Sequence, residues 1–480
     1  MTQTDEQQPP RLYAPREPIF PRRVRGPFRN LKWWIMAVTL AIYYITPWLR
    51  WDRGPYLPDQ AVLIDLAGRR FYFFWIEIWP HEFYFVAGLL IMAGLGLFLF
   101  TSALGRVWCG YACPQTVWTD LFILVERWVE GDRNARVRLW NANWSLRKIR
   151  LRVTKWVVWL CIAILTGGAW VFYFADAPAL MADLVGLTAA PVAYITIAVL
   201  TLTTFIFGGF MREQVCIYMC PWPRIQAAMM DDHTLTVAYR DWRGEPRGKH
   251  RKTPQADATL GDCVDCMACV NVCPMGIDIR DGQQMECITC ALCIDACDDV
   301  MGKLGKPRGL IDYLALADEP HERAGGAPKP LWQHVFRLRT MIYTGLWALI
   351  GVGLVWALFV RSDIHLSVEP VRNPQYVTLS DGSVRNTYTL RVRNQTEQPR
   401  TFRVMLTSDE VLRISVQTQG PHDGHIIVPA NETLNARVYV IARPQDAAAS
   451  MDTTALRLWV EDIVTDDRVS AATVFNGKGQ

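Results

Sequence analysis

Residues 263–297 read CVDCMACVNVCPMGIDIRDGQQMECITCALCIDAC, in which eight cysteines form two runs of the spacing C-x2-C-x2-C-x3-C. Gaps of two residues make a tight loop that can turn three thiolates toward one point, as a [4Fe-4S] cluster requires. In ferredoxins with two clusters, the fourth cysteine of each run ligates the other cluster. The spacing therefore predicts two clusters, one held by Cys263, Cys266, Cys269 and Cys297 and one held by Cys287, Cys290, Cys293 and Cys273.

The same eight cysteines have two alternative interpretations. Paired C-x2-C units also bind structural zinc, and cysteines in an oxidising compartment form disulfides. The third cysteine of each run and Pro274 after the fourth favour the clusters. Asp298 stands where a second proline is expected. Its charge would change the potential of a cluster without removing a ligand.

The composition of the chain indicates a membrane protein. Of 480 residues 51% are hydrophobic, and 20 are tryptophan. Five apolar stretches have the length of about 17 to 25 residues that a crossing needs, namely 33–49, 83–104, 156–174, 191–210 and 341–360. The first is the shortest, and a buried core helix is its alternative. Trp33, Trp34 and Trp48 at its ends are typical of residues at a membrane interface.

Basic residues alternate between the segments that connect these stretches. Arginine and lysine crowd the segment before the first stretch and the connection between the second and third, whereas 175–190 contains neither. Basic connections favour the cytoplasmic side, which predicts a cytoplasmic N-terminus. Five crossings then place the cysteine-rich segment in the cytoplasm and the C-terminal part outside. The formal net charge is only +4, so no nucleic-acid partner is expected.

A second cysteine pattern occurs twice. The second and fourth apolar stretches each run into Cys-x-Tyr-x-Cys-Pro, at 109–114 and at 216–221. Two helix pairs that end in the same motif at the same membrane face predict a parallel repeat whose motifs meet near its axis. Residues four apart share one face of a helix. Each motif is therefore expected to present two thiols together, as Cys109 with Cys113 and Cys216 with Cys220.

These four thiols have three functional interpretations and one structural one. They could bind Cu(I), act as a redox-active dithiol, or ligate a further cluster. They could also be buried as small apolar side chains. Elsewhere, Asp231-Asp232-His233 is either a site for a hard metal or a solvated turn, and the turn is favoured.

The expected fold is a multi-pass α-helical membrane protein with a ferredoxin domain and an all-β C-terminal sandwich. Short alternating runs after residue 360, at 388–392, 401–406, 413–416, 437–441 and 455–460, predict the strands of the sandwich. The expected parts are a basic N-terminus at 1–32, a four-helix membrane domain at 33–240, a ferredoxin domain with its tethers at 241–340, a fifth span at 341–360 and the sandwich at 361–480.

The chain resembles the FixG/RdxA/CcoG family, accessory proteins for assembly of the cbb3-type cytochrome c oxidase. The resemblance rests on the repeated motifs, the double cluster motif, the C-terminal domain and three phrases, Trp108-Cys109-Gly110, Cys113-Pro114-Gln115-Thr116-Val117 and Pro307-Arg308-Gly309-Leu310-Ile311. It implies an inner-membrane protein with an immunoglobulin-like periplasmic domain. The implied activity is reduction of Cu(II) to Cu(I) for the oxidase, which would make the four repeated-motif cysteines catalytic or copper-binding residues.

The implied partners are oxidase subunits, or copper chaperones and transporters, and the electron donor is left open. Two other functions fit the same motifs. One is a quinol-linked subunit similar to the membrane ferredoxins of nitrate or nitrous oxide respiration. The other is a non-enzymatic assembly scaffold whose clusters sense redox state.

Overall fold

The computed structural model describes residues 18–54, 57–248, 260–361, 364–396, 398–417 and 425–479. The chain divides into two compact units. The first contains the residues up to Trp51 and Gln60–Leu354, and the second contains Asp52–Asp59 and Val355–Gln480. Each unit has a hydrophobic core of its own, which is the property of a separate domain.

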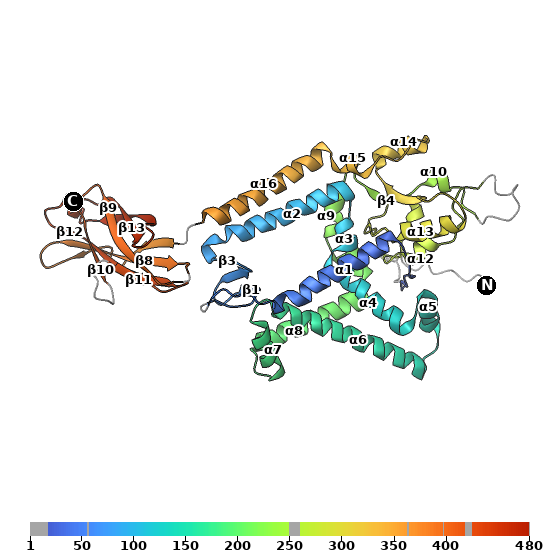
Figure 1. Cartoon of the computed structure of the whole chain (residues 1–480), viewed down its shortest axis with the longest axis horizontal. Coiled ribbons are helices and arrows are strands. Elements are labelled where there is room, and N and C mark those ends of the chain that lie inside the picture. Colours follow the sequence, from blue (N-terminus) through green and yellow to red (C-terminus); the bar gives the residue numbers. More distant parts are fainter. Residues whose placement is uncertain are drawn as a thin grey trace, which may run out of the picture. The chain divides into compact units, whose positions relative to one another are not determined.

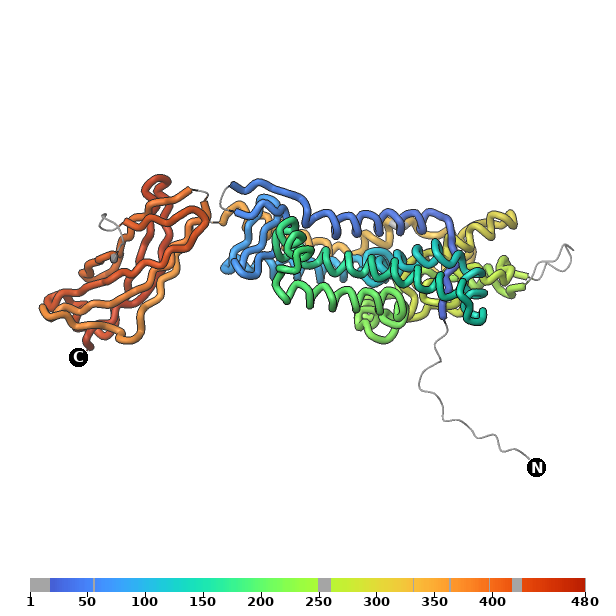
Figure 2. The backbone as a smooth tube through the Cα atoms, turned by 90° about the horizontal axis from the view of Figure 1, so that it is seen from below, coloured from blue at the N-terminus to red at the C-terminus, as the bar shows by residue number. Residues whose placement is uncertain are grey.

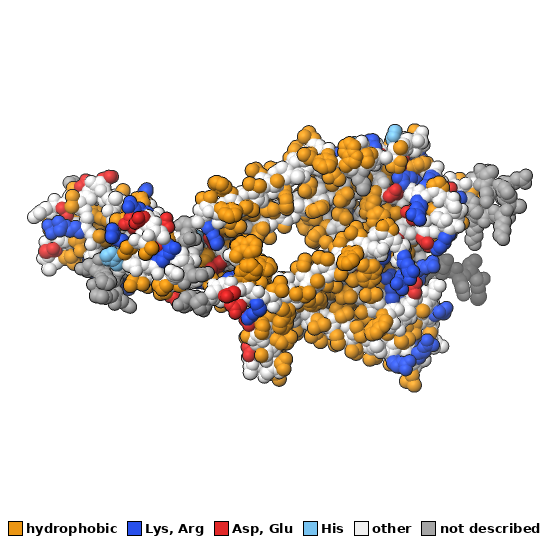
Figure 3. Space-filling view, viewed as in Figure 1, with side chains coloured by type: hydrophobic (Ala, Val, Ile, Leu, Met, Phe, Trp, Pro, Cys, Tyr) orange, Lys and Arg blue, Asp and Glu red, His pale blue; other side chains and the backbone are white. Residues whose placement is uncertain are grey.

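Four helices of the described chain are long and apolar enough to cross a membrane. They are Pro80–Leu104 (η2, Pro80–Glu82, with α2, Tyr84–Leu104), Leu146–Val171 (α6), Pro191–Met211 (α8, Pro191–Thr204, with η3, Phe205–Met211) and Leu338–Val360 (α16). The helices α6 and α8 pack side by side, and α2 runs along α16 (Figures 1 and 2). Hydrophobic side chains cover the outer surfaces of these helices, as contact with lipid requires (Figure 3). These helices coincide with four of the five expected spans.

The fifth expected span, 33–49, falls on α1 (Pro27–Ile45) and η1 (Thr46–Trp48), which are not among those four helices. Arg29 and Lys32 belong to the first turns of α1, and both side chains are buried. Arg29 donates two hydrogen bonds of 2.9 Å to Asp120 in α4 (Pro114–Glu130), and Lys32 lies 3.9 Å from the same carboxylate. The first turns of α1 therefore contact protein rather than lipid, and a fifth crossing remains a prediction.

The third crossing helix begins earlier than expected. The apolar stretch starts at Trp156, whereas α6 starts at Leu146. Ser145 caps the helix, because its hydroxyl accepts a hydrogen bond of 3.3 Å from the backbone N–H of Lys148. Arginine and lysine have high helix propensity. The basic residues that were expected in a loop thus form the first turns of α6.

The two cysteine runs lie in a small domain at one end of the first unit. It is closed by two antiparallel strands, β4 (Thr236–Tyr239) and β5 (Ile311–Leu314). The first run leads into α12 (Ala268–Val272), and the second leads into α13 (Leu292–Lys303). Because β4 pairs with β5, this domain includes residues that precede its expected boundary at 241.

One carboxylate joins the small domain to α1. Asp295 in α13 accepts hydrogen bonds from the backbone N–H groups of Phe28, at 3.3 Å, and Arg29, at 2.7 Å. Free N–H groups at the start of a helix attract negative charge. Gly26 permits this approach, since a Cβ atom there would lie 2.2 Å from Cγ of Asp295. The first turn of α1 is thus capped by a side chain from the cysteine-rich domain.

The second unit is a β-sandwich, as the alternating runs predict. One sheet has the order β10-β12-β8-β6, with β7 also paired to β8, and the other has the order β11-β9-β13-β14. The strands are β6 (Ile364–Pro370), β7 (Val377–Thr378), β8 (Val384–Asn394), β9 (Arg400–Ser408), β10 (Arg413–Gln417), β11 (His425–Val428), β12 (Thr433–Ala442), β13 (Thr453–Asp462) and β14 (Arg468–Asn476). All five expected strands are present, and each is longer than the run that predicted it. Tyr388 and Leu458, from opposite sheets, are among the fully buried side chains of its core.

Shorter elements complete the first unit. They are β1 (Val62–Asp65), β2 (Arg70–Phe73), β3 (Ile76–Ile78), α3 (Val107–Tyr111), α5 (Arg133–Asn141), α7 (Ala177–Val185), η4 (Val215–Met219), α9 (Trp222–Met229), α10 (Asp241–Gly244), η5 (Ile279–Asp281), η6 (Leu316–Asp318), α14 (Glu319–Arg323) and α15 (Leu331–Val335). The strands β1, β2 and β3 form a small antiparallel sheet in that order. The second unit also contains η7 (Ala447–Ala449).

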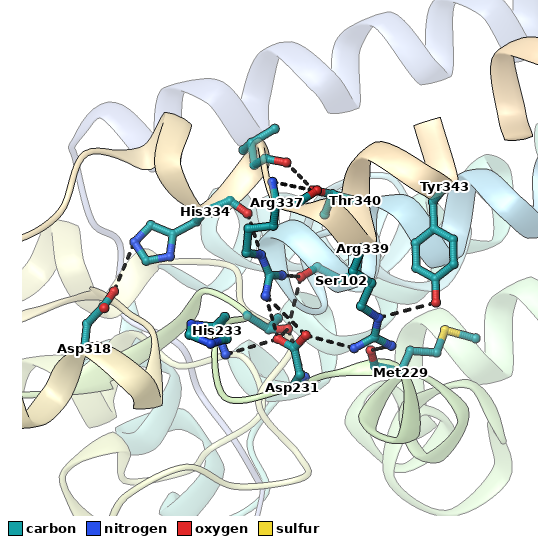
Figure 4. Close-up of polar contacts among 12 residues, drawn as sticks. Ser102, Met229, Asp231, His233, Asp318, His334, Arg337, Arg339, Thr340 and Tyr343 are labelled. Atoms are coloured by element: carbon teal, nitrogen blue, oxygen red, sulfur yellow. Dashed lines mark hydrogen bonds and ion pairs between the residues drawn. The ribbon is translucent and has the colours of Figure 1, made fainter. Parts of the chain in front are cut away.

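Asp231 fixes the start of the last crossing helix (Figure 4). Its carboxylate accepts hydrogen bonds of 2.9 Å from Arg337 and from Arg339. It also accepts hydrogen bonds from the backbone N–H of His233 and from the hydroxyl of Thr234, as in a capped turn. The sequence Asp231-Asp232-His233 therefore forms a turn that binds arginine, which agrees with the favoured interpretation.

Replacement of Asp231 by asparagine should loosen α16 from the rest of the first unit. Burial alone would raise the pKa of Asp231, but hydrogen bonds from Arg337 and Arg339 outweigh it and hold the pKa well below its usual range. The charged contact stabilises the fold above the unfolded-state pKa of about 3.9 and is lost as the pH falls through the folded-state pKa. We expect Asp231→Asn to destabilise the protein by about 1 to 2 kcal/mol at pH 7. Thermal unfolding in detergent from pH 7 to pH 3 measures the effect.

Asp232→Asn is the matched control, because Asp232 is exposed and the hydrogen bonds from Arg337 and Arg339 go to Asp231 instead. Its melting temperature should equal that of the unchanged protein at every pH. The gap between the Asp231 variant and the unchanged protein should narrow below about pH 4. Equal melting temperatures for both variants at pH 7 would contradict the role of Asp231.

Candidate iron–sulfur and thiol site

The two cysteine runs have the same backbone conformation. In the first run Asp265 and Met267 have left-handed φ angles of 52° and 57°, and in the second run Thr289 and Ala291 have φ angles of 53° and 58°. These residues flank the second cysteine of each run. Left-handed conformations cost free energy for residues with a side chain and are concentrated at functional sites. The same left-handed positions recur in both loops, whose cysteines line the cavities described below. The cysteine spacing alone did not predict these backbone conformations.

The loops enclose two small cavities. One, which we name the Cys297 cavity, is lined by Cys263, Cys266, Cys269 and Cys297. The other, named the Cys273 cavity, is lined by Cys273, Cys287, Cys290 and Cys293, and Cys269 also reaches its wall. Four thiolates are the donor set of a [4Fe-4S] cluster, so the residues present fit this cofactor. The four cysteines of each predicted set thus line one cavity, including the exchanged fourth cysteine, and their role as cluster ligands remains a prediction.

The walls of both cavities are mainly apolar, although Arg280 also lines the Cys297 cavity. Val237, Ile279 and Leu292 line the Cys273 cavity, and Met301 and Leu310 line the Cys297 cavity. Burial raises the pKa of Cys273 and of Cys297, each to about 12. A buried thiol of this kind loses its proton only when a cation replaces it, which is what cluster iron does.

The two Cys-x-Tyr-x-Cys-Pro motifs also share a conformation, although it differs from the expected one. Cys109 lies in α3 and Cys216 lies in η4, but the second cysteine of each pair lies outside these helices. Cys113 has φ −60° and ψ 129°, and Cys220 has φ −82° and ψ 125°. The expectation that each pair shares one helical face is therefore wrong. The following proline clashes with a helical conformation of the residue before it, so this residue becomes extended.

The four thiols of the repeated motifs nevertheless gather in one place. Burial, together with the charges of Cys113, Cys109 and Cys220, raises the pKa of Cys216 to about 12. The four sulfur atoms thus lie within electrostatic reach of one another. The motifs do meet, as the internal repeat predicts. The thiol of Cys109 donates a hydrogen bond of 2.9 Å to the buried amide oxygen of Gln226.

The first motif packs directly on the loop of the Cys273 cavity. Cys109 and Cys216 belong to the apolar cluster that contains Cys290 and Cys273. The hydroxyl of Tyr111 donates a hydrogen bond of 3.2 Å to the backbone carbonyl of Cys290. The repeated thiols are therefore neighbours of one of the two cluster cavities, and this proximity could not be read from the sequence.

Arg106 is the functional side chain that the sequence analysis missed. Its position near the end of a membrane helix suggested only a cytoplasmic connection, but the side chain is buried. It donates a hydrogen bond to the backbone carbonyl of Met285. Its charge acts on the thiols of Cys109, Cys216 and Cys287 and opposes the effect of burial on their pKa values. One cation thus favours thiolate in both repeated motifs and in the cluster loop.

No group of three or more histidine, cysteine, aspartate or glutamate side chains in the described residues is arranged to hold a single metal ion. Asp298, the residue in place of proline, accepts a hydrogen bond of 2.9 Å from the backbone N–H of Gly309. Gly309 has a φ angle of 80°, which favours glycine.

Three family models match the chain. A 4Fe-4S dicluster domain matches residues 211–315, a 4Fe-4S binding domain matches 85–132, and the immunoglobulin-like fold at the C-terminus of FixG matches 354–478. The first includes all eight cysteines of the two cavities and the second repeated motif. The second includes the first repeated motif. The third covers the β-sandwich.

Relatives are similar over most of their length. RdxB of Cereibacter sphaeroides is 67% identical over 98% of both chains, and RdxA of the same organism is 65% identical over 94% of this chain and 95% of its own. The chain belongs to the FixG/RdxA family. The nitrogen fixation protein FixG of Rhizobium meliloti is 58% identical over 86% of this chain and 83% of its own. A crystal structure of a FixG-related protein from Vibrio parahaemolyticus matches 25% of this chain and 99% of its own, with 22% identity and a TM-score of 0.21.

Membership of the FixG/RdxA family confirms the resemblance found in the sequence. The family models and the four apolar helices identify a membrane iron–sulfur redox protein. The immunoglobulin-like model confirms the class of the C-terminal domain. The residues that would ligate each cluster, and the role of the repeated thiols, remain predictions.

Replacement of Gly110 by alanine should damage the Cys273 cavity of this FixG/RdxA protein. A Cβ atom at Gly110 would lie 2.6 Å from the carbonyl oxygen of Ile288 and 3.0 Å from Cα of Cys290. Both are backbone atoms of the cluster loop, which cannot move away at low cost. Overpacking of this kind destabilises a protein by about 1 to 3 kcal/mol. We expect purified Gly110→Ala protein to lose iron and part of its cluster absorbance.

Gly94→Ala is the control, because Gly94 also lies in a helix but a Cβ atom there has no neighbour within 4 Å. This variant should retain the iron content of the unchanged protein. Full iron occupancy in Gly110→Ala would show that the two segments are not packed as closely as the structure indicates.

Replacement of Asp298 by asparagine should raise the reduction potential of the cluster in the Cys297 cavity. The negative charge of Asp298 acts on Cys297, and nearby negative charge opposes the addition of an electron. An asparagine keeps an oxygen for the N–H of Gly309 but removes the charge. Redox titration followed by electron paramagnetic resonance measures both potentials. Asp299→Asn is the control, because Asp299 is exposed and paired with Lys303. Equal shifts in the two variants would contradict a local effect of Asp298.

Proposed function

We propose that this chain is a membrane cupric reductase that converts Cu(II) to Cu(I) for assembly of a cbb3-type cytochrome c oxidase. One observation carries the proposal: Cys109 and Cys216 pack beside the Cys273 cavity, and the other two thiols of the repeated motifs lie within electrostatic reach of them. A group of soft ligands next to a carrier of single electrons suits a reaction that transfers one electron to copper. In that reaction Cu(II) gains one electron, and one reduced cluster loses it.

The side chains near the repeated thiols have complementary roles in this proposal. Thiolates prefer Cu(I) to harder ions, so Cys109, Cys113, Cys216 and Cys220 would retain the product. Arg106 favours the thiolate form of Cys109 and Cys216, which metal binding requires. The clusters, when bound, supply single electrons.

The proposed orientation follows from the distribution of charge. Basic side chains gather at the end of the first unit that carries the cysteine-rich domain (Figure 3). By the positive-inside rule this end faces the cytoplasm. We infer that the N-terminus and the clusters are cytoplasmic and that the β-sandwich is periplasmic. The sandwich would then bind oxidase subunits, copper chaperones or copper transporters, while its own fold supplies no thiols.

The double variant Cys109→Ser/Cys216→Ser tests the proposal. It should retain about eight irons per chain, because the cluster cysteines are unchanged. After anaerobic reduction, the unchanged protein should be reoxidised by Cu(II) in the presence of a Cu(I) chelator, and the variant should be reoxidised much more slowly. Stopped-flow absorbance of the clusters follows the reaction, and the chelator reports Cu(I).

Cys161→Ser is the control, because Cys161 is an exposed cysteine of α6 that belongs to neither repeated motif. It should react as fast as the unchanged protein. Reoxidation of the double variant at the unchanged rate would remove the thiols from the reaction. Clusters that ignore Cu(II) but are reduced by a quinol analogue would indicate a quinol-linked respiratory subunit instead.

A further inference from the structure

A large cavity lies beside the first turns of α6, away from the cysteines. Its volume is about 640 Å³, and it is bounded by Phe20, Glu126 of α4, Trp140 of α5, the first half of α6 and the residues around Phe210 of η3. Pockets that bind small molecules have volumes of about 300 to 1,000 Å³. The cavity therefore has the size of a ligand site, and no role proposed above uses it.

The charges around the cavity favour an anion. Four cations line it, Lys148, Arg152, Lys155 and Arg212, whereas the carboxylates that line it are Glu126 and Glu213. Two further residues do not line the cavity but form ion pairs with side chains that do. Arg136 forms an ion pair with Glu126, and Glu130 lies 2.9 Å from Lys155 and 3.4 Å from Arg152. With Arg136 and Glu130 included, five cations face three carboxylates, so the site still has two more positive than negative charges.

Lys148 contributes most directly to this excess. Its ammonium group donates hydrogen bonds to the backbone carbonyls of Trp140, at 3.0 Å, and Ala142, at 2.6 Å. The ion pairs of the described residues give it no carboxylate partner. The side chain is buried, yet an ammonium group has three donors. The ammonium nitrogen also lies 5.0 Å from the centroid of the Trp144 ring. This contact attracts the charge without forming a hydrogen bond to an acceptor atom, so one N–H donor of Lys148 stays available to an anionic group in the cavity.

The aromatic walls indicate that the anion belongs to an amphiphile. Lys148 and Arg152 lie in the first two turns of α6, and Trp156 and Trp159 follow one to two turns farther along the same helix. Trp144, before the helix, is 72% exposed. Tryptophan at the end of a membrane helix marks the level of lipid headgroups. The cationic part of the cavity thus lies at the headgroup level, and the aromatic part continues along the membrane helix.

We propose that this cavity binds the phosphate headgroup of an anionic phospholipid. Lys148 and Arg152 contact the phosphate, and the acyl chains lie against Trp156 and Phe210. Basic pockets between membrane helices on the cytoplasmic side bind anionic headgroups in this way. The proposal does not depend on copper reduction, since none of these residues belongs to the thiol or cluster site.

Native mass spectrometry of the full chain in detergent tests the site. The protein is titrated with phosphatidylglycerol, with phosphatidylcholine of the same acyl chains, and with inorganic phosphate. We expect one phosphatidylglycerol to bind more tightly than phosphatidylcholine, and inorganic phosphate to compete only weakly. Lys148→Gln/Arg152→Gln should weaken phosphatidylglycerol binding about twenty-five-fold, by roughly a factor of five for each cation.

Arg147→Gln/Arg150→Gln is the matched control, because it removes the same charge from exposed positions of the same helix that do not line the cavity. It should bind phosphatidylglycerol as the unchanged protein does. Lys148→Arg/Arg152→Lys keeps both charges and should also bind phosphatidylglycerol. It is the variant to measure if the glutamine variant loses iron or fails to fold. Equal affinity for both lipids, tight binding of inorganic phosphate alone, or equal losses in the cavity variant and the control would overturn the proposal.

Discussion

The close contact between Gly110 and the backbone of the Cys287–Cys293 loop is the constraint on which the site depends. Only a residue without a side chain fits there. The contact brings Cys109 to the Cys273 cavity, and the internal repeat brings Cys216 to the same place. Two membrane helices must therefore end at the level of the cysteine-rich domain. The position of the site thus determines how the membrane part and the cluster part are joined.

The loops that hold the cysteines are strained, and the surrounding structure must maintain them. Each left-handed residue with a side chain costs about 1 to 3 kcal/mol, and the two runs contain four of them. Pairing of β4 with β5, the cap that Asp295 provides for α1 and the apolar walls of the cavities oppose this cost. Iron adds to them, because metal binding to thiolates contributes to folding free energy. The cluster domain and the membrane helices therefore stabilise each other.

Local patterns predicted the parts of the chain that depend on spacing or on hydropathy. The two cysteine sets, four membrane helices and five strands of the sandwich follow from such patterns. The helical pairing of Cys109 with Cys113 was wrong, because the constraint from Pro114 outweighs the helical spacing. Burial of Arg29 and Arg106 depends on partners that are distant in sequence, Asp120 and the Met285 carbonyl. Contacts of that kind leave no periodic signal.

The charges near the two cavities differ in one respect. Arg106 places positive charge beside Cys287, and Arg280, although paired with Asp265 at 2.7 Å and Asp278 at 2.6 Å, places positive charge beside Cys269. Asp298 adds negative charge beside Cys297. If clusters occupy both cavities as proposed, this carboxylate would oppose an added electron in the Cys297 cavity, and the electron would be held more favourably in the Cys273 cavity, beside the repeated thiols. Because Arg106 also acts on those thiols, the same cation would favour both the reduced cluster and the thiolate ligands of the proposed copper site.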